Sequence, residues 1–270
     1  MKRMLVWVVL LLMFCASACA LELPENAMHH QVREKLAQMG YPVSEQAYED
    51  ARRQLSNYQQ MAQEYAGMAG MESFYAETLT GEYFAYILLM NEGLGTYDEE
   101  TWAWSPSSEH IYAFDAEFLN IDVMYTEFLL GVQAIVPDIR FADVAEDLSG
   151  MSDEWDMETY SDGTRSVSFT CNGHPYSITL DSYGDWLNDE IISFVNHVLE
   201  TEGSSGQLHI VSEPYDQCVF LIYGSSQEAA ALRQVLGVET VVEMPVMEDL
   251  PPLMQKVLDF LFLYDSRLRC

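Results

Sequence analysis

Residues 167–180 read VSFTCNGHPYSITL, a run in which apolar and polar side chains alternate on both sides of an Asn-Gly pair. Asn172 and Gly173 accept the positive φ angles that a two-residue hairpin turn requires. Alternation places every second side chain on the same face of a strand. The run therefore predicts a β-hairpin with one buried face, made by Val167, Phe169, Cys171, Tyr176, Ile178 and Leu180.

A helix and a second unit of the same kind follow this hairpin. Residues 185–200 carry apolar side chains at helical spacing, and residues 208–211 and 218–223 have the composition of a strand pair. Ser225 and Glu228 form a capping box for a helix that ends before Gly237. This order predicts an α+β fold, with an N-terminal helical segment packed with an antiparallel sheet built from two hairpin-then-helix units.

The chain before the hairpin begins with helices. Apolar positions recur every three to four residues over 25–39, from the N-cap candidate Ser44 onwards, and over 72–90. We expect residues 21–96 to form a helical region and residues 97–270 an acidic α+β domain. The other predicted elements are a strand over 110–118, a helix over 122–135, a strand over 238–244 and a buried, largely apolar helix over 252–268.

The first twenty residues have the pattern of an export signal. Lys2 and Arg3 precede an apolar run over 4–14, and Ala18 and Ala20 supply the small side chains that signal peptidase needs. Eleven apolar residues rise only about 16 Å in a helix, about half of a bilayer core, so this run does not span a membrane. We expect cleavage after Ala20 and no membrane span in the mature chain.

A second processing route stays open at Cys19. Residues 16–19 loosely resemble a bacterial lipobox, in which the cysteine becomes lipid-modified, although Ala16 stands where such boxes usually carry Leu. The mature chain has no Asn-x-Ser/Thr sequon, which favours bacterial export. The sequence thus predicts a protein that is secreted or held at the cell surface, with lipid anchoring as the alternative.

The chain is strongly acidic. It has 12 Lys and Arg against 43 Asp and Glu, a net charge of −31 at pH 7. A surface of this sign repels phosphate backbones, so we expect no nucleic-acid partner. Residues 98–162 hold 17 of the acids with Arg140 as their one Lys or Arg. Three interpretations follow: a solvated surface, a face that attracts a basic protein or peptide, and a calcium site using Asp153, Asp156, Glu158 and Asp162.

Two tryptophans lie within this acidic segment. Trp102 and Trp104 are two residues apart among Ser, Pro and acidic residues, so a strand would place both indoles on one face. Exposed aromatic rings bind sugars or the apolar patch of a partner. The alternative is that one or both rings cover the core.

The cysteines and candidate catalytic groups predict no defined reaction. Cleavage would leave Cys171, Cys218 and Cys270, of which Cys171 and Cys218 can be paired in one disulfide. Cys171 with His174 across the turn could form a thiol–base pair, but the alternation favours a buried Cys171. No zinc-protease, hydrolase-elbow or phosphate-loop motif occurs, and no cofactor is expected.

Three further groups of side chains have weaker readings. Asp115 and Glu117 form a carboxylate pair of the kind that glycoside hydrolysis uses. Met61, Met68 and Met71 could bind a soft metal, but their spacing favours filling of the core. His29 and His30 are expected on the surface of the first helix.

Together these features predict an exported, non-enzymatic acidic protein that binds a protein or surface ligand outside the cytoplasm. The alternatives are an envelope or extracellular hydrolase that uses carboxylates of the α+β domain, and a calcium-stabilised structural module.

Overall fold

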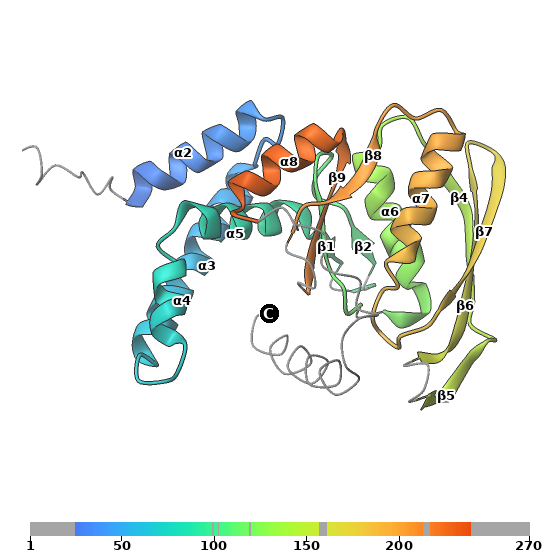
Figure 1. Ribbon diagram of the computed structural model, residues 1–270, viewed down its shortest axis with the longest axis horizontal. Helices are drawn as coiled ribbons and strands as arrows, with labels where there is room; N and C mark the ends of the chain where they lie inside the picture. Colours follow the sequence, from blue (N-terminus) through green and yellow to red (C-terminus); the bar gives the residue numbers. More distant parts are fainter. Residues whose placement is uncertain are drawn as a thin grey trace, which may run out of the picture.

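A computed structural model describes residues 25–98, 100–101, 103–118, 120–156, 161–212 and 217–238 (Figure 1). The expected export signal, the helix over 252–268 and nearly all of the strand over 238–244 lie outside these residues.

The N-terminal part is helical, as predicted. It comprises α2 (Glu25–Gln38), α3 (Glu45–Glu64), α4 (Met71–Glu77) and α5 (Gly81–Gly93). Ser44 caps α3 because its side-chain oxygen accepts a hydrogen bond from the amide of Ala47. The predicted single helix over 72–90 is wrong, since α4 and α5 are separate. Thr80 starts α5 by accepting a hydrogen bond from the amide of Tyr83, which competes with continuation of α4.

A short hairpin, a strand and a helix follow. The strands β1 (Thr96–Tyr97) and β2 (Trp104–Ser105) pair with each other, and β3 (Tyr112–Asp115) lies within the predicted strand. A 3₁₀ turn, η1 (Ile121–Val123), leads into α6 (Met124–Ile135), which confirms the helix predicted over 122–135.

The hairpin predicted over residues 167–180 is present, with Asn172 and Gly173 at its turn. The strands β6 (Ser161–Cys171) and β7 (His174–Asp181) pair so that Cys171 is opposite His174. Asn172 and Gly173 adopt φ angles of 51° and 89°. Two strands that the sequence did not predict, β4 (Phe141–Asp147) and β5 (Met151–Asp156), add to the other edge of β6. Their acidic composition concealed them, because Asp and Glu are depleted in strands.

The second hairpin-then-helix unit is also present. The helix α7 (Glu190–Thr201) precedes the antiparallel strands β8 (Gln207–Ile210) and β9 (Cys218–Gly224), and α8 (Ser226–Val235) begins with the predicted Ser225–Glu228 capping box. The order in their sheet is β3-β9-β8.

The β3-β9-β8 sheet lies between two apolar cores. Cys218, Phe220 and Ile222 belong to a core shared with α3, α5 and α8, whereas Leu221 belongs to a second core with α6 and α7. Beyond α6 and α7 lies the sheet that contains β6 and β7 (Figure 1). Because both faces of β9 are covered, its run of apolar residues is continuous rather than alternating.

The α+β class is therefore confirmed, with one difference in detail. The two predicted hairpins belong to separate antiparallel sheets rather than to one. The reason is that α7 presents Ile191, Val195 and Val198 to the second core, so a helical layer separates the hairpins. The core with α5 and α8 also takes residues from both sides of the boundary expected at 96/97, which itself stays a prediction. Among the described helices, none combines the length and the hydrophobicity that a membrane span requires.

One buried ion pair joins α6 to the sheet of β4 and β6. Arg165 donates to Glu146 Oε2 at 3.2 Å and to the carbonyl oxygen of Ile121 at 2.5 Å, and the two charged side chains are 1% and 3% exposed. Glu146 Oε1 accepts from the amide and hydroxyl of Thr126 at 2.8 and 2.9 Å. Both charges are thus paired and hydrogen-bonded, which burial of charge requires.

We predict that Glu146→Gln lowers the free energy of unfolding by about 3–5 kcal/mol, because it leaves the Arg165 charge buried without a counter-charge. Urea unfolding monitored by circular dichroism measures the change. The matched control is Glu45→Gln, which breaks the exposed Arg33–Glu45 pair and should cost less than about 1 kcal/mol. Equal losses in the two variants would refute this role for Glu146.

Candidate functional site

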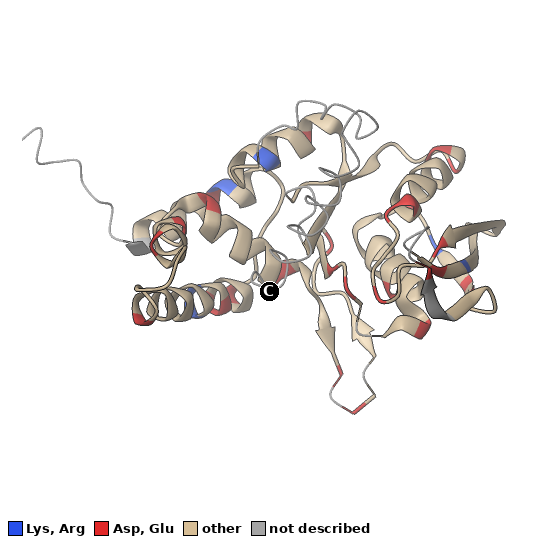
Figure 2. Cartoon of the chain, turned by 60° about the horizontal axis from the view of Figure 1, so that its bottom comes forward, with Lys and Arg blue, Asp and Glu red and all other residues tan. Residues whose placement is uncertain are grey.

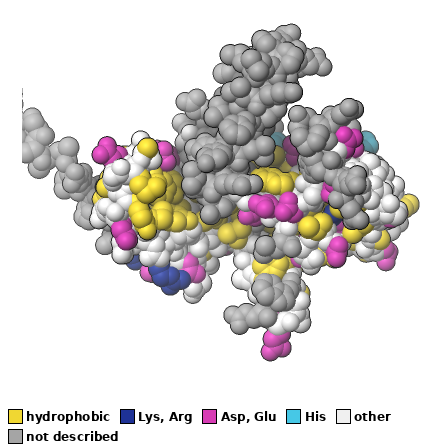
Figure 3. Space-filling view, turned by 90° about the horizontal axis from the view of Figure 1, so that it is seen from below, with side chains coloured by type: hydrophobic (Ala, Val, Ile, Leu, Met, Phe, Trp, Pro, Cys, Tyr) yellow, Lys and Arg dark blue, Asp and Glu magenta, His cyan; other side chains and the backbone are white. Residues whose placement is uncertain are grey.

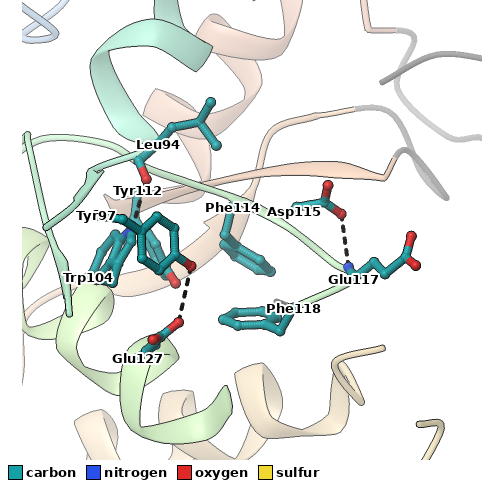
Figure 4. Close-up of a pocket in the computed structure, with 9 residues that line it drawn as sticks. All are labelled: Leu94, Tyr97, Trp104, Tyr112, Phe114, Asp115, Glu117, Phe118 and Glu127. Atoms are coloured by element: carbon teal, nitrogen blue, oxygen red, sulfur yellow. Dashed lines mark hydrogen bonds between the residues drawn. The ribbon is translucent and has the colours of Figure 1, made fainter. Parts of the chain in front are cut away.

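A pocket opens where the β1–β2 hairpin, β3 and α6 meet (Figure 4). Its volume is about 250 Å³. It is lined by Leu94, Tyr97, Trp104, Tyr112, Phe114, Asp115, Glu117, Phe118 and Glu127. Aromatic rings and carboxylates thus share one cavity, and most of its lining falls in the acidic segment singled out above.

The aromatic wall is a chain of touching rings. The Trp104 ring lies 5.3 Å from Tyr112, Tyr112 lies 4.9 Å from Phe114, and Phe114 lies 5.7 Å from Phe118, measured between centroids. In Figure 4 the rings of Phe114 and Phe118 face the space between Glu127 and the Asp115–Glu117 pair. Tilted rings in mutual contact form a rigid surface that needs little ordering when a ligand binds.

Close contact between α6 and β3 places this wall. A Cβ atom added to Gly131 of α6 would lie 2.4 Å from Cζ of Tyr112, so only glycine lets the ring of Tyr112 lie against the helix. Pairing of β1 with β2 sets Tyr97 opposite Trp104 at the mouth of the pocket. The indole Nε1 of Trp104 donates to the carbonyl oxygen of Leu94 at 2.9 Å, which fixes the ring.

Glu127 is the buried acid of the pocket. It lies in the first turn of α6 and is 7% exposed. Tyr97 donates its hydroxyl to Glu127 Oε2 at 3.3 Å, and among the described residues no Lys, Arg or His forms an ion pair with this carboxylate. Burial, together with the nearby charge of Glu146, raises the pKa of Glu127 above its usual value, although the Tyr97 hydrogen bond opposes that rise.

The same surroundings act on Tyr97. Burial and the adjacent Glu127 carboxylate raise the pKa of Tyr97 to about 12. The tyrosine therefore keeps its proton at neutral pH and remains a hydrogen-bond donor.

Asp115 and Glu117 stand at the opposite side of the pocket. Asp115 Oδ1 accepts from the amide of Glu117 at 2.9 Å, and Gln217 Nε2 donates to Asp115 Oδ2 at 3.3 Å and to Glu117 Oε2 at 3.0 Å. The segment is held in place because the amide of Phe118 donates to the carbonyl oxygen of Asp185. Asp115 is half-buried and Glu117 is exposed, and the Glu117 carboxylate points away from the rings in Figure 4.

The charge around the pocket is of one sign. In Figure 2 acidic residues are spread over the whole described chain, whereas Lys and Arg are few. Of the described basic residues beyond position 96, Arg165 is buried against Glu146. Arg140 Nη1 donates to the carbonyl oxygen of Ile139, and Arg233 donates to that of Ile210. A cation that enters the pocket therefore meets carboxylates with no competing guanidinium within its lining.

Of the two readings for the tryptophans, Trp104 follows the one in which the ring covers the core. Its side chain is 7% exposed and belongs to the second core, because the Leu94 hydrogen bond and the Tyr112 contact turn the indole inward. Trp104 is nevertheless among the residues that line the pocket. Trp102 lies outside the described residues.

The acids considered for a calcium site do not form a cluster of ligands among the described residues. Glu158 and the side chain of Asp153 lie outside what is described, Asp156 is paired with Ser161 in the β5–β6 ladder, and Asp162 Oδ1 accepts from the amide of Gly184. Within the described ranges, no three His, Cys, Asp or Glu side chains converge as metal ligands would.

The disulfide considered possible between Cys171 and Cys218 does not form. Both side chains are buried, but Cys171 belongs to the second core and Cys218 to the first, on opposite sides of the β3-β9-β8 sheet. A bridge would need their Cβ atoms about 4 Å apart, which this separation of the two cores opposes.

Cys171 is also unsuited to act as a nucleophile with His174. Burial and the charge of Glu202 raise the pKa of the Cys171 thiol to about 11, which disfavours the reactive thiolate. His174 Nδ1 lies 2.8 Å from Glu202 Oε1, which also accepts the Tyr176 hydroxyl at 2.5 Å. These contacts tie the hairpin to the end of α7.

Two other expectations are corrected. His29 is buried and stacks on Phe84, with ring centroids 3.8 Å apart, whereas His30 is exposed as expected. Met61 and Met68 do not fill the core, since they are 40% and 59% exposed.

Sequence reasoning named Trp104, Asp115 and Glu117 but missed Tyr97 and Glu127. A signal for Glu127 did exist: it lies in a helix whose neighbouring positions Phe128 and Leu129 are apolar, and its own position falls on the buried face. An acid on such a face is unusual unless it is paired or functional.

No known protein family matches this chain, and no curated protein or solved structure shows significant similarity to it.

We predict that Glu127→Gln becomes more stable relative to the wild type as the pH rises from 4 to 7. Because the folded-state pKa of Glu127 is raised, protonation of this carboxyl group stabilises the folded wild type. That contribution to stability is fully present below the usual pKa of 4.5 and is lost as the pH rises through the folded-state pKa. Gln keeps an acceptor for Tyr97 but carries no charge. Urea unfolding across this pH range measures the difference.

The matched control is Glu64→Gln, which makes the same change on the exposed side of α3. The difference in unfolding free energy from the wild type should change more with pH for Glu127→Gln than for Glu64→Gln. Equal changes would show that burial does not raise the pKa of Glu127.

Proposed function

We propose that this chain is an exported, non-enzymatic binding protein whose pocket receives a positively charged side chain of a basic protein or peptide outside the cytoplasm. The observation that carries the proposal is Glu127, a buried carboxylate on an aromatic wall with no described cation beside it. A ligand cation would supply the missing counter-charge.

The chemistry of the lining favours a cation over a neutral or anionic ligand. The π faces of aromatic rings attract an ammonium or guanidinium group that lies within about 6 Å of their centroids. Hydrogen bonds from such a group to carboxylate oxygens are among the strong ones, and Glu127 and Asp115 both offer acceptors. An anionic ligand would face uncompensated repulsion in the same place.

The size of the pocket favours a single side chain. Sites for drug-sized ligands span about 300–1,000 Å³, and this cavity, at about 250 Å³, falls below that range. A Lys or Arg side chain of a larger partner suits both the small volume and the mixed lining of the pocket. Its apolar stem can lie along the aromatic rings while its charged end contacts the carboxylates.

The acidic surface supports the same partner. Complementary fields raise the rate of encounter between oppositely charged proteins, and the effect weakens as salt rises. Residues 98–162, which contain most of the pocket lining, hold 17 acids with Arg140 as their one Lys or Arg.

Glycoside hydrolysis is the second candidate, favoured by two carboxyls in one pocket. Burial raises the pKa of Glu127, as a general acid requires, and Asp115, which accepts hydrogen bonds from Gln217 and from the backbone, supplies a second carboxyl group. Release of nitrophenol from a panel of nitrophenyl glycosides, lost in Glu127→Gln, would favour this candidate over the binding protein.

We predict that a five-residue lysine peptide binds the mature protein and that Glu127→Gln weakens this binding by about tenfold or more. Loss of a hydrogen bond between charged groups costs about 1.5–3 kcal/mol, which corresponds to that factor. Titration calorimetry at low salt measures the affinity. Binding should also weaken as the pH is lowered, because protonation removes the charge of Glu127. Since the pKa of Glu127 is raised, this loss should begin at a higher pH than for a glutamate of ordinary pKa.

Two controls separate the pocket from general electrostatic attraction. The same peptide with acetylated lysines lacks the charge and should not bind. Glu64→Gln removes one charge far from the pocket lining and should leave the affinity within about twofold. If Glu127→Gln and Glu64→Gln bind the lysine peptide equally well, the pocket is not the site.

We further predict that the exported chain begins at Leu21, after cleavage behind Ala20. Mass spectrometry of protein collected outside the cytoplasm of an expressing bacterium identifies the new N-terminus. A start at Cys19 with an added lipid mass would support the lipoprotein alternative, which Cys19→Ala would abolish. An uncleaved chain in the cytosol would overturn the proposal of export.

A further inference from the structure

An apolar patch lies on the opposite part of the molecule, where α3 ends and α4 leads into α5. We call it the α3–α4 patch, and it comprises Met61, Tyr65, Met68 and Leu79, which are 40%, 48%, 59% and 52% exposed. Figure 3 shows hydrophobic side chains gathered on this side of the chain. Several large apolar side chains exposed along one short part of the chain are typical of a site that another apolar surface covers.

Three aromatic rings near the patch residues in the sequence pack against one another. The rings of Tyr58 and Phe74 lie 6.0 Å apart, and Phe74 lies 6.0 Å from Tyr83 of α5, edge to face in each case. All three side chains are only partly buried in the described structure. These rings thus form an ordered aromatic cluster that joins α3, α4 and α5, the helices that carry or flank the patch residues.

The described chain ends beside this patch. After α8, a Cβ atom added to Gly237 would lie 3.1 Å from Cγ of Glu82, the residue before Tyr83, and Val238 is 8% exposed within the first core. Leu79 lies two residues before Gly81, the first residue of α5. The next part of the chain thus starts within a few residues of the patch.

That remaining part contains a strongly apolar segment. Every residue over 253–264 is apolar except Gln255, Lys256 and Asp259. The fourteen residues between Val238 and Leu253 can extend to about 46 Å, at about 3.3 Å each, so the segment can reach any part of the patch.

The surroundings of the patch are acidic, whereas the C-terminal stretch is slightly basic. No Lys or Arg occurs between Arg53 and Arg140, and the exposed acids Glu64, Glu72 and Glu77 adjoin the patch in the sequence. Residues 253–270 carry Lys256, Arg267 and Arg269 against Asp259 and Asp265, so this end of the chain has three basic and two acidic side chains. Opposite charges around an apolar contact favour one orientation of binding.

We propose that residues 253–264 of this same chain cover the α3–α4 patch. Contact removes both apolar surfaces from water, and because the segment is tethered at Val238 its effective concentration at the patch exceeds that of a separate partner. The proposal concerns a different surface from the cation pocket and does not depend on it.

Photo-cross-linking in the full mature chain tests the proposal. Benzoylphenylalanine in place of Leu79 should cross-link to residues 253–264 of the same chain, as identified by peptide mass spectrometry. The matched control is Leu130, 39% exposed on α6, which should give no cross-link to that segment. Cross-links from position 79 that join two copies, or that reach only other parts of the chain, would overturn the proposal.

A second variant supplies the reciprocal test. Leu258→Asp with Leu261→Asp should lower the yield of the position-79 cross-link by about fivefold or more, because burial of an unpaired carboxylate is unfavourable. The same variant should increase the fluorescence of an added hydrophobic dye, and Met68→Glu with Leu79→Glu should remove that increase. An unchanged cross-link yield in the Asp variant would contradict the docking.

Discussion

The buried pair of Arg165 and Glu146 is the constraint on which the placement of α6 depends. Arg165 reaches the carbonyl of Ile121 just before the helix, and Glu146 accepts from the amide and hydroxyl of Thr126 in its first turn. These contacts join the start of α6 to β4 and β6 across a region that excludes water. A pair of this kind fixes an orientation more than it stabilises the fold, because desolvation offsets much of the Coulomb attraction.

The position of α6 in turn decides the chemistry of the pocket. Thr126 is followed directly by Glu127, so the anchored turn presents this carboxylate to the aromatic wall instead of to water. Gly131, one turn further on, lets Tyr112 lie against the helix. A buried acid in this position has a raised pKa and no positively charged side chain paired with it among the described residues. Both properties favour a cationic ligand.

The two proposed sites lie on opposite sides of the β3-β9-β8 sheet and use different physics. The pocket belongs to the second core, where aromatic rings and acids share a small cavity. The α3–α4 patch adjoins the first core, where large apolar side chains remain exposed. One surface calls for a cation and the other for an apolar segment, so the two proposals can be tested independently.

Several local structures and the electrostatic character of the chain could be predicted from the sequence alone. Turn chemistry at Asn172–Gly173 and the capping box at Ser225 depend on neighbouring residues alone, and so does the acidity of residues 98–162. Other features depend on packing between separate parts of the chain. Trp104 is turned inward by its hydrogen bond to Leu94, and Glu127 accepts a hydrogen bond from Tyr97. Cys171 and Cys218 lie in different cores. These features depend on contacts between separate segments of the chain. Hydrophobic periodicity predicts which face of a helix or strand is buried, but it does not identify the residues against which that face packs.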